Sequence, residues 1–354
     1  MTSRRRVRMH RPAVGDDIAD LRFMMDMLAV RTWRNYRDGH LLGLTPGEES
    51  VTDANLLDLH RQFPQLGIRR LTKAAEKRIG ADWEWWIGSG ADRWLCIRVQ
   101  AKRINKTGYP TLNHEGLDDD DHQYDTLIKS CTDTYTFPYH VFYNGWEDDR
   151  FRTRAGARAD LEALSSNSRP HPEPPYAVSQ HAGGEFHRHG TRMDHRDPML
   201  WGCAALSTYH VAQLHSANVQ RCYAPRYLAQ AMPWSQLFSG RHEKIMDLPG
   251  RDDASLLDRI HHRLNADIVE ARRHEPTQHS LNLDLVDDPV ELGALRDLRR
   301  ERLPGYAEAV MAANLERVSF DESFFEAEHA PATYTIVTDL TDFGPSRAID
   351  RLPF

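Results

Sequence analysis

The clearest pattern of apolar and polar positions lies between residues 80 and 104. Two apolar runs, Trp83 to Ile87 and Trp94 to Val99, flank a Gly-rich link that contains GSGAD. Such a link between two strand-like runs is typical of a β-hairpin. Because side chains alternate between the faces of a strand, Gln100 and Lys102 should share one face just after the second run. The pattern predicts a hairpin with polar groups gathered at its ends.

Helical spacing precedes this hairpin. From about Asp16 to Arg37, Leu, Met and Ala recur at the spacing of an amphipathic helix. A second helix is predicted within residues 47–64, with Thr52 or Asp53 as its cap and Pro64 as its stop.

The pattern after the hairpin predicts one more helix and one more strand. HQYDTLIKSCTDT reads as a helix, and PYHVFYN reads as a buried strand. The acidic run Asp118 to Asp121 lacks the spacing of a calcium loop and is expected to be solvated. The order helix, hairpin, helix, strand over residues 48 to 144 predicts an α/β unit with a mixed sheet.

The second half changes character twice. Residues 147 to 198 are rich in Pro, His, Ser and Arg, which indicates a loop-rich insertion. Its histidines are expected to lie in solvent, in preference to binding zinc. LWGCAALSTYHVAQL then predicts a helix that packs closely through small residues. From about Arg251 to Glu316 the chain is charged and helical, and a last strand is predicted from Tyr334 to Thr338.

Four arginines of this helical region are expected on a solvated helix face, in preference to contacts with phosphates. They are Arg296, Arg299, Arg300 and Arg302. The composition shifts divide the chain into an N-terminal helical segment (1–45), a core (46–240) with its insertion at about 147–198, and a mainly helical C-terminal region (241–354) with a terminal strand.

Composition limits the classes of function. The 354 residues carry a formal net charge of -7, so a nucleic-acid site would have to be a local basic groove. No apolar run reaches the ~18 residues of a membrane span, so we expect a cytoplasmic protein with no membrane partner. The four cysteines lie far apart without a CxxC pair, which favours reduced, buried thiols over disulfides or a zinc site.

Candidate chemistry gathers at the ends of the hairpin. Asp82 heads the first strand, Gln100 and Lys102 end the second, and Glu48 and Glu49 lie at or just before the first turn of the preceding helix. Each has an ordinary explanation alone, such as acids at the positive end of a helix. Together, in this order, they supply what metal-assisted phosphodiester cleavage needs: hard oxygen ligands for Mg²⁺ and a cation near the developing charge.

These motifs carry a resemblance to a known superfamily. The acidic helix, GADWEWW, RVQAK, the helix with Gln123, and PYHVFYN together resemble the PD-(D/E)XK nucleases. The QAK element resembles the Mrr-type variant, in which Gln replaces the second acid. GEESVTDANLL and PWSQLFSG are also similar to segments of a bacterial family of that superfamily. The resemblance covers residues 45 to 145 well and 200 to 240 weakly. It implies a restriction-endonuclease-like fold: a mixed β-sheet flanked by helices, here with a loop-rich insertion and a helical C-terminal region.

The resemblance also implies an activity, a nuclease that requires Mg²⁺ or Mn²⁺ and cleaves DNA in restriction or anti-phage defence, with a homodimer as one arrangement. In this interpretation Asp82 is the principal metal ligand and Gln100 the second. Glu49, with Glu48 as the less favoured choice, adds an outer acid, and Lys102 orients the attacking water. Candidate substrate contacts are Gln123, Glu84 and Glu48, and Glu84 is also a possible substitute ligand.

Two other classes of function remain open at this stage. A neutral Gln attracts a divalent cation less than a carboxylate does, so the chain could be an inactive nuclease-fold module that binds nucleic acid or a protein partner. A metal-independent hydrolase that uses Cys and His ranks third, because no cysteine stands in a recognisable nucleophile context.

Overall fold

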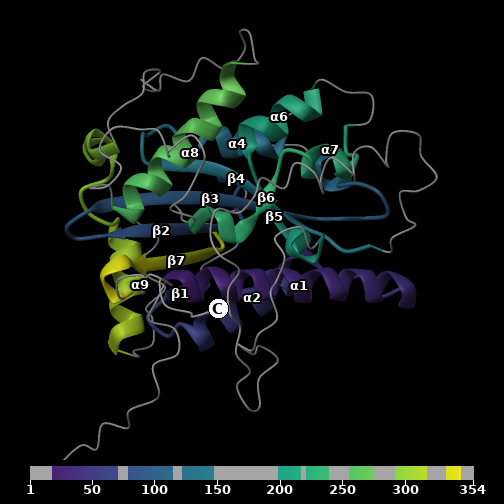
Figure 1. The fold of residues 1–354 in the computed structure, drawn as a ribbon, viewed down its shortest axis with the longest axis horizontal. Coiled ribbons are helices and arrows are strands. Elements are labelled where there is room, and N and C mark those ends of the chain that lie inside the picture. The colour runs from purple at the N-terminus through teal and green to yellow at the C-terminus, as the bar shows by residue number, and fades with distance from the viewer. Residues whose placement is uncertain are drawn as a thin grey trace, which may run out of the picture.

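The chain folds around one mixed sheet of seven strands, which confirms the predicted α/β class. The computed structural model describes residues 18–70, 79–114, 122–146, 198–216, 221–238, 255–273, 292–316 and 332–343. The strands are β1 (Gly67–Arg70), β2 (Trp83–Ser89), β3 (Arg93–Arg103), β4 (Thr136–Tyr143), β5 (Cys203–Ser207), β6 (Met232–Pro233) and β7 (Tyr334–Asp339). They lie in the order β1-β7-β2-β3-β4-β5-β6 (Figure 1).

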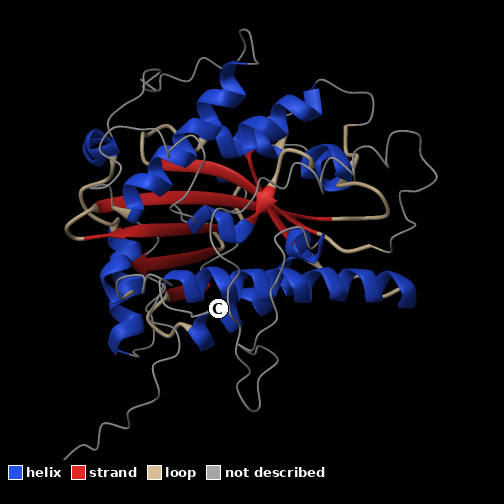
Figure 2. Cartoon of the chain, in the orientation of Figure 1, coloured by secondary structure: helices blue, strands red, loops and turns tan. Residues whose placement is uncertain are grey.

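Helices enclose this sheet (Figure 2). The α-helices are α1 (Ile18–Leu42), α2 (Glu48–Gln62), α4 (Gln123–Lys129), α6 (Thr208–Ser216), α7 (Ala224–Leu228), α8 (Leu256–Arg273) and α9 (Gly305–Glu316). Short 3-10 helices span Pro110–Asn113, Pro198–Gly202, Trp234–Phe238, Leu292–Leu298 and Leu340–Asp342. Trp83 and Trp85 belong to a large core that includes apolar residues of α1, α2 and α8, whereas Trp86 and Trp94 pack in a second cluster with α9.

β2 and β3 form the predicted hairpin, and β3 is longer than the sequence pattern indicated. The register pairs Trp83 with Val99, so residues 100–103 extend beyond the first residue of β2. Along the opposite edge β3 runs parallel to β4, where Gln100 lies beside His140. The end of β3 is therefore supported by a strand on one edge, while on the other edge no described strand accompanies it.

α2 begins earlier than predicted. Gly47, in an extended conformation, is its N-cap, so the prediction of Thr52 or Asp53 as the cap is wrong. The physical reason is that the Thr52 hydroxyl has other partners: it donates to the Glu48 carbonyl (3.0 Å) and shares a 2.8 Å hydrogen bond with the Tyr143 hydroxyl. Thr52 is thereby buried inside the helix, against the sheet.

The small residues after the insertion form strand β5, and the predicted helix begins only at Thr208. Close packing does occur, but at the turn before the strand. A Cβ on Gly202 would lie 1.9 Å from the carbonyl oxygen of Ala29 in α1, so glycine is required there. The helical prediction was wrong because a short run of small apolar residues suits a buried strand equally well.

The last strand lies inside the sheet. β7, predicted at Tyr334 to Thr338 and confirmed there, lies between β1 and β2 and runs parallel to β2. Val337 of β7 packs with Tyr306 and Val310 of α9. Since α1 also contributes to the large core, the described parts of the predicted N-terminal and C-terminal regions share one core with the central region.

The segment just before α9, which was predicted to be helical, is not a helix. A 3-10 helix ends at Leu298, and the chain is then irregular up to Gly305. Arg299 is 4% exposed, and Arg300 forms a β-bridge with Trp94 through hydrogen bonds of 2.9 and 3.1 Å. A solvated arginine face is therefore wrong for Arg299, because this segment covers the start of β3.

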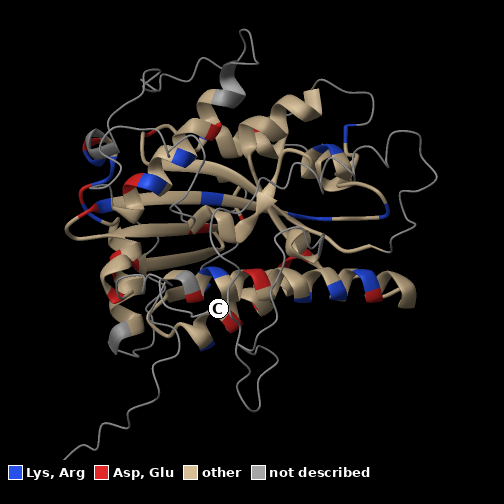
Figure 3. Cartoon of the chain, viewed as in Figure 1, with Lys and Arg blue, Asp and Glu red and all other residues tan. Residues whose placement is uncertain are grey.

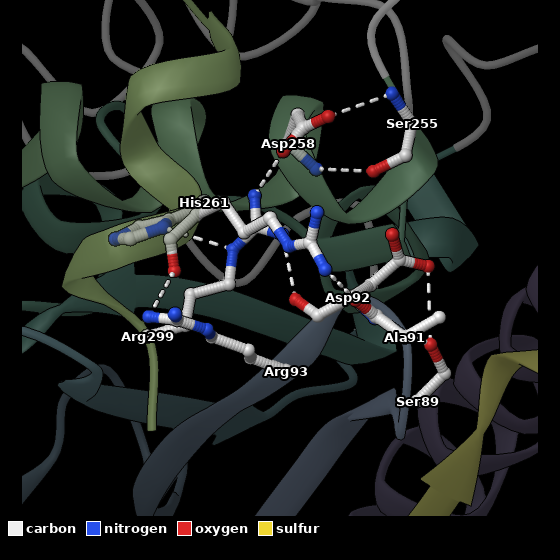
Figure 4. Close-up of polar contacts among 9 residues, drawn as sticks. Ser89, Ala91, Asp92, Arg93, Ser255, Asp258, His261 and Arg299 are labelled. Carbon is white, nitrogen blue, oxygen red and sulfur yellow. Dashed lines mark hydrogen bonds and ion pairs between the residues drawn. The ribbon is translucent and has the colours of Figure 1, made fainter. Parts of the chain in front are cut away.

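Arg299 fastens the tip of the hairpin to α8 (Figure 4). Its guanidinium forms an ion pair with Asp258, donates to the Asp92 carbonyl (3.0 Å) and donates through Nε to His261 Nδ1 (3.3 Å). We call Asp92, Asp258, His261 and Arg299 the hairpin latch. Burial, followed by the charge of Arg299, lowers the pKa of His261 to about 3.

Other predictions bear on the rest of the chain. Cys96, Cys131, Cys203 and Cys222 are all free thiols, and the first three are buried, as predicted. No described helix is both long and apolar enough to cross a membrane. The predicted insertion up to residue 197, with His187, His189 and His195, and the acidic run 118–121 lie outside the described residues.

The latch predicts a pH-dependent stability. Below pH 6.5 the unfolded chain gains a proton at His261, while the folded protein gains it only near pH 3. The free energy of unfolding should therefore fall as the pH falls through this window, with His261 contributing up to about 1.4 kcal/mol per pH unit. Urea unfolding at several pH values should show a shallower pH slope for His261→Gln, which retains an acceptor for Arg299 but does not titrate. Equal slopes in the two proteins would contradict a neutral His261 in the fold.

Candidate active site

The extension of β3 beyond β2 brings two carboxylates to its edge. The Asp82 amide donates to the Val99 carbonyl (2.9 Å). The backbone amides and carbonyls of odd-numbered β3 residues therefore point to the edge on which β2 lies. Further along this edge, the amide of Ala101 donates to Asp82 Oδ2 (2.6 Å) and the amide of Arg103 donates to Glu48 Oε1 (2.9 Å). Successive amides on one edge lie about 6.7 Å apart. Acids from two different elements thus take the place of a neighbouring strand.

Gly80 fixes the chain just before Asp82. Its φ of +68° lies in the left-handed region that favours glycine. A Cβ there would lie 2.9 Å from the Gln123 carbonyl oxygen and 2.9 Å from the Leu127 amide nitrogen, both in the backbone of α4. The Gly80 carbonyl also accepts a 2.9 Å hydrogen bond from Gln100 Nε2. Gly80 therefore connects the approach to β2 with both β3 and α4.

Gln100 has one satisfied end and one unsatisfied end. The residue is 1% exposed, and its Nε2 is bound to Gly80. Its Oε1 is buried and has no hydrogen-bond partner among the described residues. Turning the amide around would place two oxygens against each other, so the Gly80 carbonyl fixes the orientation. A buried polar atom without a partner costs about 1–3 kcal/mol of stability. A ligand that bound Oε1 would remove this cost, so Oε1 is the atom of Gln100 that is available to a ligand.

Lys102 lies on the same face of β3 as Gln100, as the alternation predicted. The residue is 4% exposed, and its Nζ donates to Gln123 Oε1 (2.9 Å). Gln123 is the first residue of α4, so the helix start positions the lysine.

His140 is a buried neighbour of these two side chains. It lies beside Gln100 on β4, is fully buried, and its Nδ1 is 3.0 Å from the Thr208 hydroxyl. Burial, followed by the charge of Lys102, holds the pKa of His140 well below its ordinary value. The imidazole is therefore neutral near pH 7.

The two acids at the start of α2 point to different places. Glu48 reaches the end of β3, and its Oε1 also accepts a 3.4 Å hydrogen bond from the Thr111 hydroxyl. The side chain of Glu49 is 61% exposed and lies 3.7 Å from a guanidinium nitrogen of Arg70. The structure thus brings Glu48 into the group and leaves Glu49, the favoured candidate, outside it.

Glu84 is also outside the group. It is fully buried, where it accepts hydrogen bonds from Trp86 Nε1 (3.1 Å) and the Thr335 hydroxyl (3.3 Å) and lies 3.6 Å from Arg98 Nε. This carboxylate balances the charge of Arg98 inside the sheet. It is not placed to bind a substrate or to substitute for Asp82.

The candidate group matches the donor chemistry of a hard divalent cation. Among the described residues no cluster of three or more His, Cys, Asp or Glu side chains could hold a metal. Mg²⁺, however, prefers oxygen ligands and is commonly held by only one or two protein carboxylates, with water completing its shell. Asp82 and Glu48 supply carboxylates, and Gln100 supplies the buried oxygen that lacks a partner.

The cysteines do not offer comparable chemistry. Burial raises the pKa of Cys131 to about 11 and that of Cys203 to about 12, and it raises the pKa of Cys96 well above its ordinary value. These thiols stay protonated near pH 7, and a protonated thiol is a poor nucleophile. The hydrolase interpretation based on Cys and His therefore finds no support at these three positions.

Two residues of the site, His140 and Gly80, were not among the site residues predicted from the sequence. His140 stands within the apolar run PYHVFYN, and an ionisable residue in a strand that reads as buried could have indicated a site. Gly80 precedes Asp82 by two positions, but its role depends on contact with α4, which no local pattern reveals.

Fold and site together define a mixed α/β protein in which two acids, a glutamine and a lysine lie at the end of one strand, β3. The sequence profile of a family of unknown function, DUF6615, matches residues 21–339, which is most of the chain. The chain belongs to this family. No curated protein matches it.

The packing at Gly80 predicts an unusually costly substitution. Gly80→Ala places a methyl group against the backbone of α4 and forces a left-handed alanine, so we expect the free energy of unfolding to fall by about 3 kcal/mol or more. Gly43→Ala is the matched control, because Gly43 has a φ of +70° but nothing within 4 Å of an added Cβ. It should lose only about 1–2 kcal/mol. Equal losses in urea unfolding would contradict the proposed contact.

Proposed function

We propose that this protein is a metal-dependent endonuclease that cleaves phosphodiester bonds of DNA, built on a restriction-endonuclease-like core of the PD-(D/E)XK type. The observation that carries the proposal is the end of β3, where Asp82 and Glu48 bind backbone amides beyond the first residue of β2, next in sequence to Gln100 and Lys102. The element order α2, β2, β3, α4, β4, with β3 parallel to β4, supports it as well. This is the order on which the resemblance rests.

The proposed metal ligands are Asp82, Gln100 and Glu48, the last in place of Glu49. A bound Mg²⁺ or Mn²⁺ would polarise a phosphoryl oxygen and lower the pKa of a bound water. Asp82 and Glu48 keep their side chains in place through the amides of β3, so little ordering is needed on binding. Gln100 presents Oε1 because its Nε2 is fixed on Gly80.

Lys102 supplies the cationic part of the chemistry. Gln123 binds one of its three ammonium donors, which leaves donors for a phosphoryl oxygen or for the attacking water. Because Lys102 is 4% exposed, its charge acts in a medium less polar than water and stabilises developing negative charge more strongly. Gln123 thereby acts as a positioning residue in this proposal.

The biological setting extends the same proposal. The resemblance supports restriction or anti-phage defence, with DNA as the partner and a homodimer as one assembly. A cytoplasmic location, expected from the sequence, is part of the same proposal.

A second function is favoured by one observation. Asp82 and Glu48 both accept backbone hydrogen bonds, a role that completes the sheet edge without any metal. With a neutral Gln100 beside them, the chain would then be an inactive nuclease-fold module that binds nucleic acid or a protein partner.

Cleavage assays separate the two functions. Purified protein should nick or cut supercoiled DNA with Mg²⁺ or Mn²⁺, and Asp82→Asn or Lys102→Met should reduce the rate by about 100-fold or more. Glu48→Gln should also slow cleavage, whereas Glu49→Gln should not. Asn and Gln still accept the backbone hydrogen bonds, so thermal unfolding should confirm that these variants are folded.

No cleavage of DNA by folded wild-type protein with either metal would reject the nuclease and favour the binding module. Equal effects of Glu48→Gln and Glu49→Gln would reject the assignment of Glu48.

A further inference from the structure

Basic side chains extend the candidate site along one edge of the molecule. After β3 the chain makes a tight turn, closed by hydrogen bonds from the Asn105 amide to the Gly108 carbonyl (2.8 Å) and back (3.1 Å). Lys106 is exposed within this turn and has a φ of 55°. Only four positions separate Lys106 from Lys102, a span of at most about 13 Å.

A second segment brings more positive charge to the same edge. The Tyr109 amide donates to the Cys222 carbonyl (2.8 Å), and the Ala224 amide donates to the Thr107 carbonyl (3.0 Å). Arg221 is therefore next to this turn, and Arg226 follows in α7. With Arg103, which ends β3, and Lys106, these residues form what we call the basic edge: Arg103, Lys106, Arg221 and Arg226. In Figure 3, lysine and arginine colour the end of β3, the turn after it and part of α7, on the right of the view.

The four side chains of the basic edge are not neutralised by neighbouring acids among the described residues. Within the described part of the chain, none of its four side chains forms an ion pair with an acid. Arginines elsewhere do, namely Arg31, Arg37, Arg61, Arg70, Arg93, Arg98 and Arg299. Like charges gathered on one side of a protein repel one another and destabilise the fold, a cost that an anionic partner would offset.

The exposed apolar residues indicate the form of such a partner. Single strands bind by stacking bases on exposed aromatic side chains in a positive groove. The large hydrophobic residues exposed in the described structure are Leu41, Leu42, Leu44 and Leu57, with no aromatic residue among them. Contacts to the phosphates of a duplex need only cations, because the bases remain stacked in the helix.

We propose that the basic edge binds the phosphate backbone of a nucleic-acid duplex and leads it to the end of β3. The inference rests on the proposed nuclease function for its purpose, since it assigns the substrate form of that site. Arg299 is not available for such contacts, because it is used in the hairpin latch.

Binding measured without cleavage tests the basic edge directly. Fluorescence anisotropy in EDTA would compare a short blunt DNA duplex with one of its strands at several salt concentrations. The test variant is Lys106→Gly with Arg221→Gln. Glycine adopts the φ of Lys106 readily, so the turn should be kept. The control is Arg302→Gln, an exposed arginine beside the bridge at the other end of β3, about 30 Å away.

The test variant should bind the duplex about tenfold more weakly and lose about 0.9 from the slope of log affinity against log salt for each lost contact, while the control is unchanged. Equal affinity of the test variant and wild type, or single-strand binding as tight as duplex binding, would overturn the proposal. Cleavage that persists unchanged in the test variant would reject the basic edge and leave the nuclease standing. Duplex binding by this edge without cleavage would reject the nuclease alone.

Discussion

The site depends on one constraint: backbone amides at a strand edge must be bonded. β3 extends beyond the first residue of β2, so no described strand lies beside the amides of Ala101 and Arg103. Without Asp82 and Glu48 these two amides would lack hydrogen-bond acceptors. A buried amide without a partner costs about 1–3 kcal/mol, so the fold gains by directing Asp82 and Glu48 onto them. The same hydrogen bonds concentrate two negative charges beside a buried amide and a buried lysine. A requirement of sheet formation thus sets the electrostatics of the candidate site.

The group is also tied to α4 from two sides. Gly80 lies against the first turns of that helix, and Gln123 from its first residue holds Lys102. At the other end of the helix, Arg98 donates to the Ser130 carbonyl while its charge is balanced by Glu84. The buried ion pair and the tight glycine contact therefore act on one element, and they restrict how far α4 can shift relative to β3.

Local patterns were enough to predict the hairpin, α4 and β4, because alternation, a Gly-rich link and helical spacing each lie within a few residues. Pairing between distant segments was not accessible in this way. Nothing near β7 shows that it enters between β1 and β2. The choice of Glu48 over Glu49 depends on about 100° of rotation around a helix whose start was placed too late. Gln100 and Lys102 were found because strand alternation fixes their shared face.

The central position of β7 has a consequence for biosynthesis. The Tyr334 amide donates to the Asp82 carbonyl (3.1 Å), so the backbone on which the candidate ligand stands is completed by a segment made about 250 residues later. Until β7 is made, β2 lacks its parallel neighbour and the Asp82 carbonyl lacks its hydrogen bond from Tyr334, although the Asp82 amide can already bind Val99 of β3. β7 is made after every other described strand, so the sheet around Asp82 can be completed only once β7 has been synthesised.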